Sequence, residues 1–260
     1  MSYSEKEVQE ISRKKNVELQ EETIFSQEKK IFLKYSKAGD EFLILFVHGS
    51  PGSWDAYFDY LVDKDILENS TLISFDRLGF GKSNPTQASV SLEEHSKSVQ
   101  TTLNHFPKAK KIILVGHSYG GPIVLKHISM NQNIACSVLL AGTYDPDLEN
   151  PEWYNKVGDW KIVQFVLPKG LLHSNLEMMP LKQELEILSK DLKQVRSRTL
   201  FLHGKKDSIV NYQHSVWANQ QLNPQRTKLT LLQDQNHFLP WNEFQKVKEL
   251  ILDCKSQTAR

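Results

Sequence analysis

A serine flanked by glycines constrains this chain of 260 residues more than any other feature of its sequence. Residues 116–120 read Gly-His-Ser-Tyr-Gly, directly after the apolar run at 112–115. Such a run predicts a buried strand, and the apolar residues that follow Gly120 predict a helix that begins at once. Ser118 is therefore expected at a sharp strand-to-helix turn that exposes its hydroxyl. Gly116 and Gly120 would let the strand and the helix approach each other.

Short apolar runs predict strands along the whole chain. Their ranges are 17–25, 31–35, 42–47, 71–75, 112–115, 136–140, 199–202 and 228–232. Apolar residues at helical spacing lie between the later runs, so strands and helices alternate. This alternation predicts an α/β fold with a mostly parallel, doubly wound central sheet of about eight strands, helices on both faces, and the first two strands as an antiparallel hairpin.

The domain organisation is predicted to be simple. No linker-like composition divides the chain, so residues 1–260 are expected to form a single domain. Residues 1–20 are charged and weakly periodic, and they predict a peripheral N-terminal arm that is either a surface helix or frayed. Residues 143–194 break the alternation with several prolines and no strong strand, and they predict a small helical cap.

Apolar residues within this predicted cap fall into two groups. Those at helical spacing are expected to face the main body: Leu185, Leu188, Leu192 and Val195. Others either cover the site or form the cap's own core: Trp153, Tyr154, Trp160, Phe165, Met178 and Met179.

Charge and cysteine content exclude several classes of partner. The 32 basic and 31 acidic side chains are dispersed, so there is no basic surface for nucleic acid. Cys136 and Cys254 are expected to form neither a disulfide framework nor a paired metal motif, and this cysteine content is compatible with a reducing compartment.

The N-terminus lacks the apolar region of a signal peptide, and no apolar stretch of membrane length follows. We expect a cytoplasmic protein without a membrane span.

The serine turn in its strand-and-helix context resembles the nucleophile elbow of the α/β-hydrolase family, and the resemblance runs from about residue 31 to about residue 252. The family's pattern implies Ser118 as nucleophile, followed along the chain by an acid and then a histidine. Among nine histidines, the implied base is His237 in the sequence Asp-Gln-Asn-His-Phe-Leu-Pro. It follows the last predicted strand and precedes the final predicted helix.

The resemblance also implies the acid. Residues 204–210 read Gly-Lys-Lys-Asp-Ser-Ile-Val and are similar to the family's Gly-x-x-Asp-x-x-Val loop, which implies Asp207. Asp145, which also follows a predicted strand, is the alternative. A serine hydroxyl is a poor nucleophile, so it needs a base that a carboxylate holds in the right tautomer. The chosen carboxylate would accept the Nδ1 proton of His237.

Two backbone N–H groups are implied for the oxyanion hole. One belongs to Tyr119, directly after the nucleophile. The other belongs to Ser50, in a His-Gly-Ser-Pro-Gly loop at 48–52. This loop resembles the family's His-Gly-x-Pro loop, and His48 is expected to brace it.

Residues 76–83 resemble the family's Asp-x-x-Gly-x-Gly-x-Ser loop. Their spacing fits neither a dinucleotide-binding nor a phosphate-binding loop, so we expect them to have a structural role. Three aromatic residues suggest an apolar substrate pocket: Trp54, Tyr57 and Phe238.

The function that the resemblance implies is that of a serine esterase, which cleaves a small or medium carboxylic ester through an acyl-enzyme intermediate. No metal motif is present and no cofactor is needed. A fold does not determine a function. The alternatives are a carbon–carbon bond hydrolase, a cofactor-free haloperoxidase or perhydrolase, and a non-enzymatic ligand-binding protein on the same scaffold. The acyl group and the oligomeric state stay open.

Overall fold

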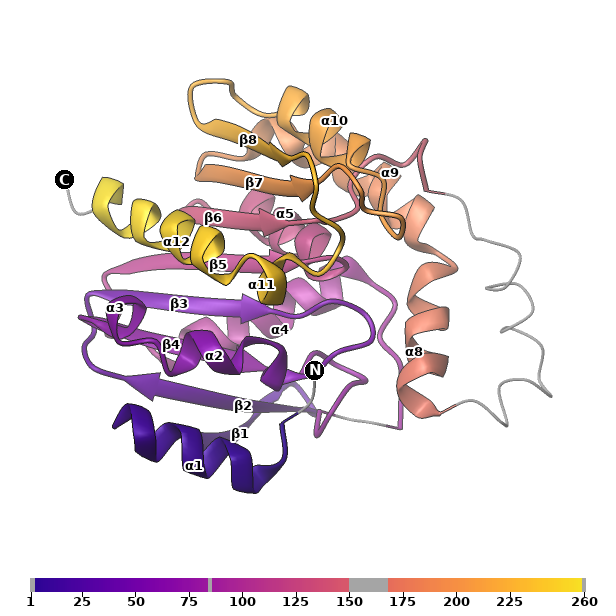
Figure 1. Cartoon of the computed structure of the whole chain (residues 1–260). Coiled ribbons are helices and arrows are strands. Elements are labelled where there is room, and N and C mark those ends of the chain that lie inside the picture. Colours follow the sequence, from indigo (N-terminus) through magenta and orange to yellow (C-terminus); the bar gives the residue numbers. More distant parts are fainter. Residues whose placement is uncertain (1–2, 84–85, 150–167, 259–260) are drawn as a thin grey trace.

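The structure is a computed structural model that describes residues 3–83, 86–149 and 168–258. Eight strands form one sheet in the order β1-β2-β4-β3-β5-β6-β7-β8 (Figure 1). The strands are β1 (Gln20–Ser26), β2 (Lys29–Lys37), β3 (Phe42–Val47), β4 (Ser70–Phe75), β5 (Lys111–His117), β6 (Ile134–Leu140), β7 (Arg198–Gly204) and β8 (Thr227–Leu232). β1 pairs with β2 and β2 with β4 in antiparallel fashion, and the other pairs are parallel. The predicted sheet and its N-terminal hairpin are confirmed.

Helices cover both faces of the sheet, which confirms the doubly wound architecture (Figure 1). One face carries α1 (Glu5–Lys15), α2 (Phe58–Leu61), α3 (Lys64–Leu67), α11 (Leu239–Asn242) and α12 (Phe244–Thr258). The other face carries α4 (Leu92–His105), α5 (Gly120–Met130), α9 (Leu181–Asp191) and α10 (Gln213–Gln221). Within the described ranges, none of the helices has the length and apolar character that crossing a bilayer requires.

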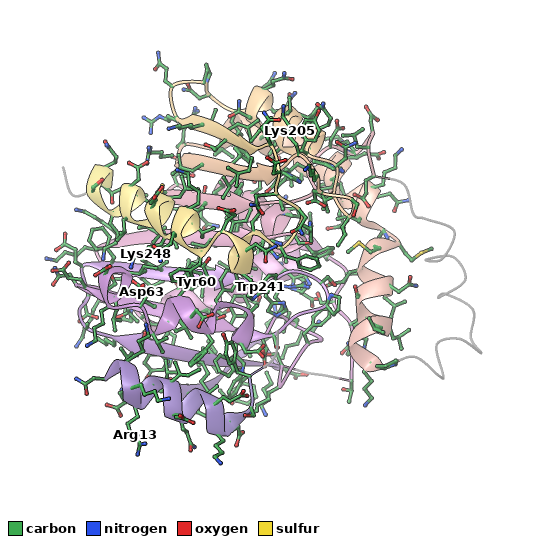
Figure 2. All side chains as sticks on the ribbon, viewed as in Figure 1. Arg13, Tyr60, Asp63, Lys205, Trp241 and Lys248 are labelled. Atoms are coloured by element: carbon green, nitrogen blue, oxygen red, sulfur yellow. A yellow bond between two sulfur atoms is a disulfide. The ribbon has the colours of Figure 1, made fainter. Side chains whose placement is uncertain are left out.

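The alternating side chains of β3 divide between two hydrophobic cores. Leu43, Leu45 and Val47 belong to the core under α4 and α5. Phe42, Ile44 and Phe46 belong to the core under α2 and α12. Every residue of β3 is buried, as expected for a central strand whose two faces are both covered by helices. On the face that carries α3 and α12, Lys248 of α12 pairs with Asp63 at the start of α3 at 2.8 Å, and Figure 2 shows both side chains between these helices.

The N-terminal arm is a surface helix rather than a frayed segment. Ser4 and Glu7 form a capping box at the start of α1, and the ring of Tyr3 lies 4.7 Å from that of Phe58. The helix ends at Asn16, which adopts a left-handed conformation. Val17 closes this terminal turn through a hydrogen bond to the Ser12 carbonyl, so β1 begins at Gln20 and not at residue 17 as predicted.

Between β6 and β7, the described residues 141–149 form turns and loop, and the helices of this segment lie within residues 169–194. The segment contains α8 (Lys169–Met178), α9 and the 3₁₀ turn Leu192–Gln194. The side chains expected to face the main body are buried in the core that α4 and α5 cover: Leu185, Leu188, Leu192 and Val195. Met178 packs against the same core. Trp153, Tyr154, Trp160 and Phe165 lie outside the described residues. The division into one domain with a cap at 143–194 therefore stays a prediction.

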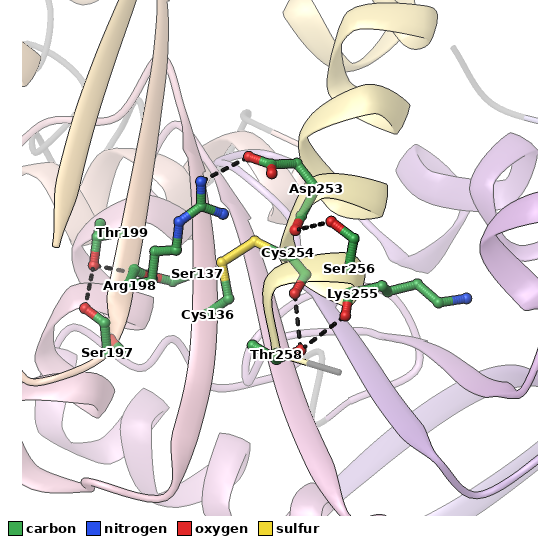
Figure 3. The surroundings of a disulfide bond; sticks show 10 residues. All are labelled: Cys136, Ser137, Ser197, Arg198, Thr199, Asp253, Cys254, Lys255, Ser256 and Thr258. Carbon is green, nitrogen blue, oxygen red and sulfur yellow. Dashed lines mark hydrogen bonds and ion pairs between the residues drawn. A yellow bond between two sulfur atoms is a disulfide. The ribbon is translucent and has the colours of Figure 1, made fainter. Parts of the chain in front are cut away.

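A disulfide joins Cys136 of β6 to Cys254 of α12 (Figure 3). The expectation that the two cysteines form no disulfide framework is therefore wrong. They are 118 residues apart in sequence, but α12 packs across β6 and brings their Cα atoms to 5.7 Å. Arg198 of β7 and Asp253 add an ion pair at 2.7 Å next to the disulfide. Disulfides persist in oxidising compartments, and the cytoplasmic localisation stays a prediction.

Loss of this bond is expected to destabilise the fold. We expect the double variant Cys136→Ala/Cys254→Ala to lose about 2–4 kcal/mol in free energy of unfolding, because the bond closes a long loop in the unfolded chain. Urea unfolding with and without a thiol reductant measures the difference. The reductant should destabilise the wild type and leave the double variant unchanged. Equal stability of the oxidised wild type, the reduced wild type and the variant would contradict the expectation.

Candidate active site

Ser118 lies at the turn between β5 and α5 with a φ of 53°. A positive φ is unfavourable for serine and persists only where the surroundings enforce it. Here the Ser118 N–H donates to the Leu140 carbonyl at 2.9 Å, and the Ser118 carbonyl accepts from the Gly121 N–H at 2.9 Å. The structure therefore has the sharp strand-to-helix turn that the sequence predicts.

The two glycines of the turn leave no space for a side chain. A Cβ at Gly116 would lie 2.5 Å from the Gly120 carbonyl oxygen, and one at Gly120 would lie 2.2 Å from the Val47 carbonyl oxygen. Both neighbours are backbone atoms that cannot move without displacing a strand or a helix. A Cβ at Gly49 would likewise lie 2.9 Å from the Ser118 Cβ, so the loop after β3 comes directly against the serine.

His237 donates a hydrogen bond from Nδ1 to Oδ2 of Asp207 at 2.7 Å. Asp207 follows β7 and His237 follows β8, so both lie beyond the carboxyl ends of parallel strands, as Ser118 does beyond β5. Among the described residues, Asp207 is the only carboxylate hydrogen-bonded to His237. The carboxylate of Asp145, the alternative acid, instead accepts from the Asp147 N–H at 3.0 Å.

The Asp207 carboxylate has several further donors. Nε2 of His203 donates to its Oδ2 at 3.1 Å, and the N–H groups of Ile209 and Val210 donate to its Oδ1 at 2.9 and 2.8 Å. Burial acts to raise the pKa of Asp207, but the hydrogen bonds from His203, His237 and Val210 outweigh it and hold the pKa well below its usual range. The carboxylate is thus anionic at neutral pH.

Sequence reasoning assigned no role to His203 or to His117, which both support the pair. The Ser215 hydroxyl bonds to Nδ1 of His203 at 2.7 Å, which leaves Nε2 as the nitrogen that donates to Asp207. Nε2 of His117 donates to the His237 carbonyl at 2.9 Å. The sequence indicates these two residues only by their positions: His203 lies near the end of a strand just before the acid loop, and His117 directly precedes the nucleophile.

The two predicted oxyanion-hole residues flank the serine. Tyr119 is buried immediately before the first residue of α5, and Ser50 lies in the loop after β3. His48 braces this loop, because its Nδ1 donates to the Gly49 carbonyl at 2.7 Å and its Nε2 accepts from the Arg77 N–H at 3.0 Å. Burial, with the nearby Arg77 charge, lowers the pKa of His48 well below its usual value, so the ring is neutral as this pattern requires. The roles of the Ser50 and Tyr119 N–H groups stay predictions.

A cavity of about 540 Å³ is lined by Ser118, His237 and the loop after β3. Its volume lies within the range of small-molecule sites. Ile209 and Phe238 also line the cavity and are 62% and 47% exposed, so apolar side chains lie at its opening. Trp241 of α11 completes this side of the wall, and Figure 2 shows it at the base of that short helix. Phe238 is thus placed where the sequence predicted it.

Trp54 and Tyr57, which the sequence also assigned to the pocket, do not line this cavity. They lie on the 3₁₀ turn Trp54–Tyr57, which turns Tyr57 onto the sheet, where its ring stacks on Phe46 at 4.8 Å. The Trp54 ring instead faces Lys34, whose Nζ is 5.1 Å from its centre, in a separate hollow beside α1. Within the described ranges, no group of three or more His, Cys, Asp or Glu side chains is arranged to hold a metal ion.

Residues 43–162 match the model of the alpha/beta hydrolase fold family. The fold superimposes on a candidate aryl esterase from Burkholderia cenocepacia with a TM-score of 0.71 at 21% identity, over 93% of this chain and 100% of that one. It is similar to 2-hydroxy-6-oxo-6-phenylhexa-2,4-dienoate hydrolase from Rhodococcus sp. strain RHA1, with a TM-score of 0.71 at 17% identity over 92% and 99% of the two chains.

A candidate lipase from Acinetobacter baumannii AYE gives a TM-score of 0.68 at 18% identity, over 99% of this chain and 98% of that one. No curated protein matches the chain in sequence. At these identities the likeness to the solved structures shows the fold alone.

Buried histidines are expected to make the stability depend on pH. Burial lowers the pKa of His127 and of His214 from 6.5 to about 4, and burial with the nearby His237 lowers that of His117 to about 3. Between these values and 6.5 the unfolded chain binds more protons than the folded chain, so the free energy of unfolding falls as the pH falls. Burial of Asp76 acts in the opposite sense, because it raises the pKa of that carboxyl from 3.8 to about 6.

Because these histidines outnumber Asp76 and Glu149, whose pKa burial also raises, we expect a lower urea midpoint at about pH 5 than at about pH 7. The variant His127→Gln should reduce the slope of stability against pH by at most about 1.4 kcal/mol per pH unit. A midpoint that does not fall toward pH 5 would contradict this expectation.

The close packing at Gly120 predicts that a side chain at this position destabilises the fold. Gly120→Ala is expected to lower the free energy of unfolding by about 1–3 kcal/mol, because its Cβ would press against the Val47 carbonyl. Gly170→Ala in α8 is the matched control: a Cβ there meets nothing within 4 Å, and alanine favours a helix by up to about 1 kcal/mol. Chemical denaturation of both variants tests this, and equal effects would refute the packing argument.

Proposed function

Because the chain belongs to the alpha/beta hydrolase fold family, we propose that it is a serine hydrolase that cleaves a small or medium carboxylic ester. The observation that carries the proposal is the hydrogen bond at 2.7 Å between His237 Nδ1 and Asp207. This pair lies beside a cavity that Ser118 also lines. A nucleophile, a base and an oriented carboxylate are the groups that acyl transfer requires.

The proposed reaction begins with the tautomer of His237. Since its Nδ1–H is donated to Asp207, Nε2 is free to accept the Ser118 proton as Oγ bonds to the carbonyl carbon. The imidazolium then gives this proton to the departing alcohol, and the acyl group stays on Ser118. Water attacks the acyl-enzyme with His237 again as base, which releases the acid and restores the serine.

Electrostatics support this sequence of steps. The low pKa of Asp207 keeps a negative charge beside the ring, and this charge stabilises the imidazolium that forms during attack. The carbonyl oxygen becomes negative at the same moment, and we assign the N–H groups of Ser50 and Tyr119 to bind it. These groups are fixed dipoles, so they need little reorganisation when the charge develops.

The cavity supports the proposed substrate class. A volume of about 540 Å³ accommodates a small or medium acyl group. The exposed side chains of Ile209 and Phe238 give its opening an apolar character that suits an aliphatic or aromatic ester. Carbon–carbon bond hydrolysis, perhydrolysis and ligand binding without turnover are the other outcomes that a substrate panel distinguishes.

Kinetics with nitrophenyl esters of short and medium chain length test the proposal. We expect turnover by the wild type, loss of activity in Ser118→Ala, and a decrease in kcat on the order of 10³–10⁴-fold in Asp207→Asn, which loses the correct tautomer of His237. Asp145→Asn, which alters the alternative acid, is the matched control and should retain activity.

Labelling of Ser118 by a fluorophosphonate provides a second readout that does not depend on the choice of substrate. A folded wild type that is neither labelled nor active on any ester would refute the proposal. Cleavage of a diketone without any esterase activity would favour a carbon–carbon bond hydrolase instead.

A further inference from the structure

A buried ion pair lies behind the candidate oxyanion loop. Arg77 follows β4 and Glu177 belongs to α8, and both side chains are completely buried. Arg77 Nη1 donates to Glu177 Oε1 at 2.6 Å and Nη2 donates to Oε2 at 3.0 Å, so the two groups form a bidentate pair. The sequence predicts only a structural role for the loop that contains Arg77, and no sequence pattern points to Glu177.

The Glu177 carboxylate has two further donors. The Ser50 hydroxyl donates to Oε2 at 2.7 Å, and His95 Nε2 donates to Oε1 at 3.0 Å. A buried carboxylate is costly unless charged and hydrogen-bonding partners compensate it, and here they come from α4 and from the loops after β3 and β4. One side chain of α8 therefore reaches the loop that lines the cavity beside Ser118.

The same cluster fixes the orientation of one peptide group. The Gly49 carbonyl accepts from Arg77 Nη2 at 3.0 Å and from His48 Nδ1 at 2.7 Å. This carbonyl and the Ser50 N–H belong to one planar trans peptide, so they point in opposite directions. Two donors that hold the carbonyl toward the protein interior thus turn the N–H away from Arg77. The hydrogen bond from the Ser50 hydroxyl to Glu177 restrains the side chain of Ser50 as well.

We infer that Glu177, acting through Arg77 and Ser50, is a positioning residue that sets the direction of the Ser50 N–H in the oxyanion hole. The inference rests on the proposed function of that N–H. Glu177 does not line the cavity, so it acts on the reaction only through the residues that it holds. An oxyanion donor acts mainly in the transition state, so its misalignment lowers kcat and leaves KM almost unchanged.

Ser50→Ala is the primary variant, because it removes the hydroxyl bond to Glu177 and leaves the ion pair and the Ser50 backbone in place. Loss of a whole oxyanion donor costs about 10²–10³-fold in kcat. We expect a decrease of about 10-fold for the misaligned donor in Ser50→Ala and of about 10²-fold in Glu177→Gln, with KM within about twofold of the wild type. The affinity for a trifluoromethyl ketone transition-state analogue should weaken by the same factors.

His173→Ala is the matched control on the same helix. Nδ1 of His173 donates to the Gly79 carbonyl at 2.6 Å, so this variant loosens the attachment of α8 without touching the Gly49–Ser50 peptide. Its kcat and its affinity for the ketone should stay close to those of the wild type. If His173→Ala lowers kcat as much as Glu177→Gln, the effect comes from the seating of α8 and the inference is overturned.

The outcomes separate this inference from the proposed function. If Ser118→Ala is inactive while Ser50→Ala keeps the wild-type kcat and ketone affinity, the positioning role is overturned and the serine hydrolase stands. If Glu177→Gln does not fold, Ser50→Ala decides the question by itself, since the ion pair is intact there. A wild type that neither turns over an ester nor reacts with a fluorophosphonate overturns the proposed function and the positioning role together.

Discussion

The Val47 carbonyl oxygen occupies the space that any side chain at residue 120 would need, so the end of β3 and the start of α5 meet backbone to backbone. Ser118 has its positive φ two residues before this contact, and the loop after β3 lies against the serine. The geometry of the candidate site thus depends first on the absence of two side chains. The polar groups around the serine are arranged on a framework that close packing has already fixed.

Two buried carboxylates then organise the polar groups on either side of this turn. Asp207 accepts hydrogen bonds from His237 and His203. Glu177 accepts hydrogen bonds from Ser50 and Arg77. A buried charge becomes strongly destabilising when one partner is removed, because the remaining group is left without compensation. Each carboxylate therefore favours one arrangement of loops that come from distant parts of the chain.

The features that the sequence predicted correctly are those encoded by residues that are neighbours in the chain. The strands, the serine turn and the loops that contain Asp207 and His237 are encoded by neighbouring residues, and the sheet and the pairing of these two side chains matched expectation. The contact of Ser50 with Glu177 and the bond between Cys136 and Cys254 join residues more than a hundred positions apart, and no local pattern reveals such partners. Trp54 and Tyr57 were misplaced because sequence proximity to the oxyanion loop does not say which way a short 3₁₀ turn rotates its rings.

The disulfide encloses every residue from Cys136 to Cys254, and this loop contains Asp207 and His237 while Ser118 lies outside it. A single proteolytic cut anywhere within the loop would leave two fragments that are still covalently linked. A cut between Cys136 and Asp207 would put Ser118 on one fragment and both Asp207 and His237 on the other, and the two fragments could not diffuse apart. Under non-reducing electrophoresis such a nicked molecule would migrate as one species, and it would separate into two bands only after the sulfur bridge is opened.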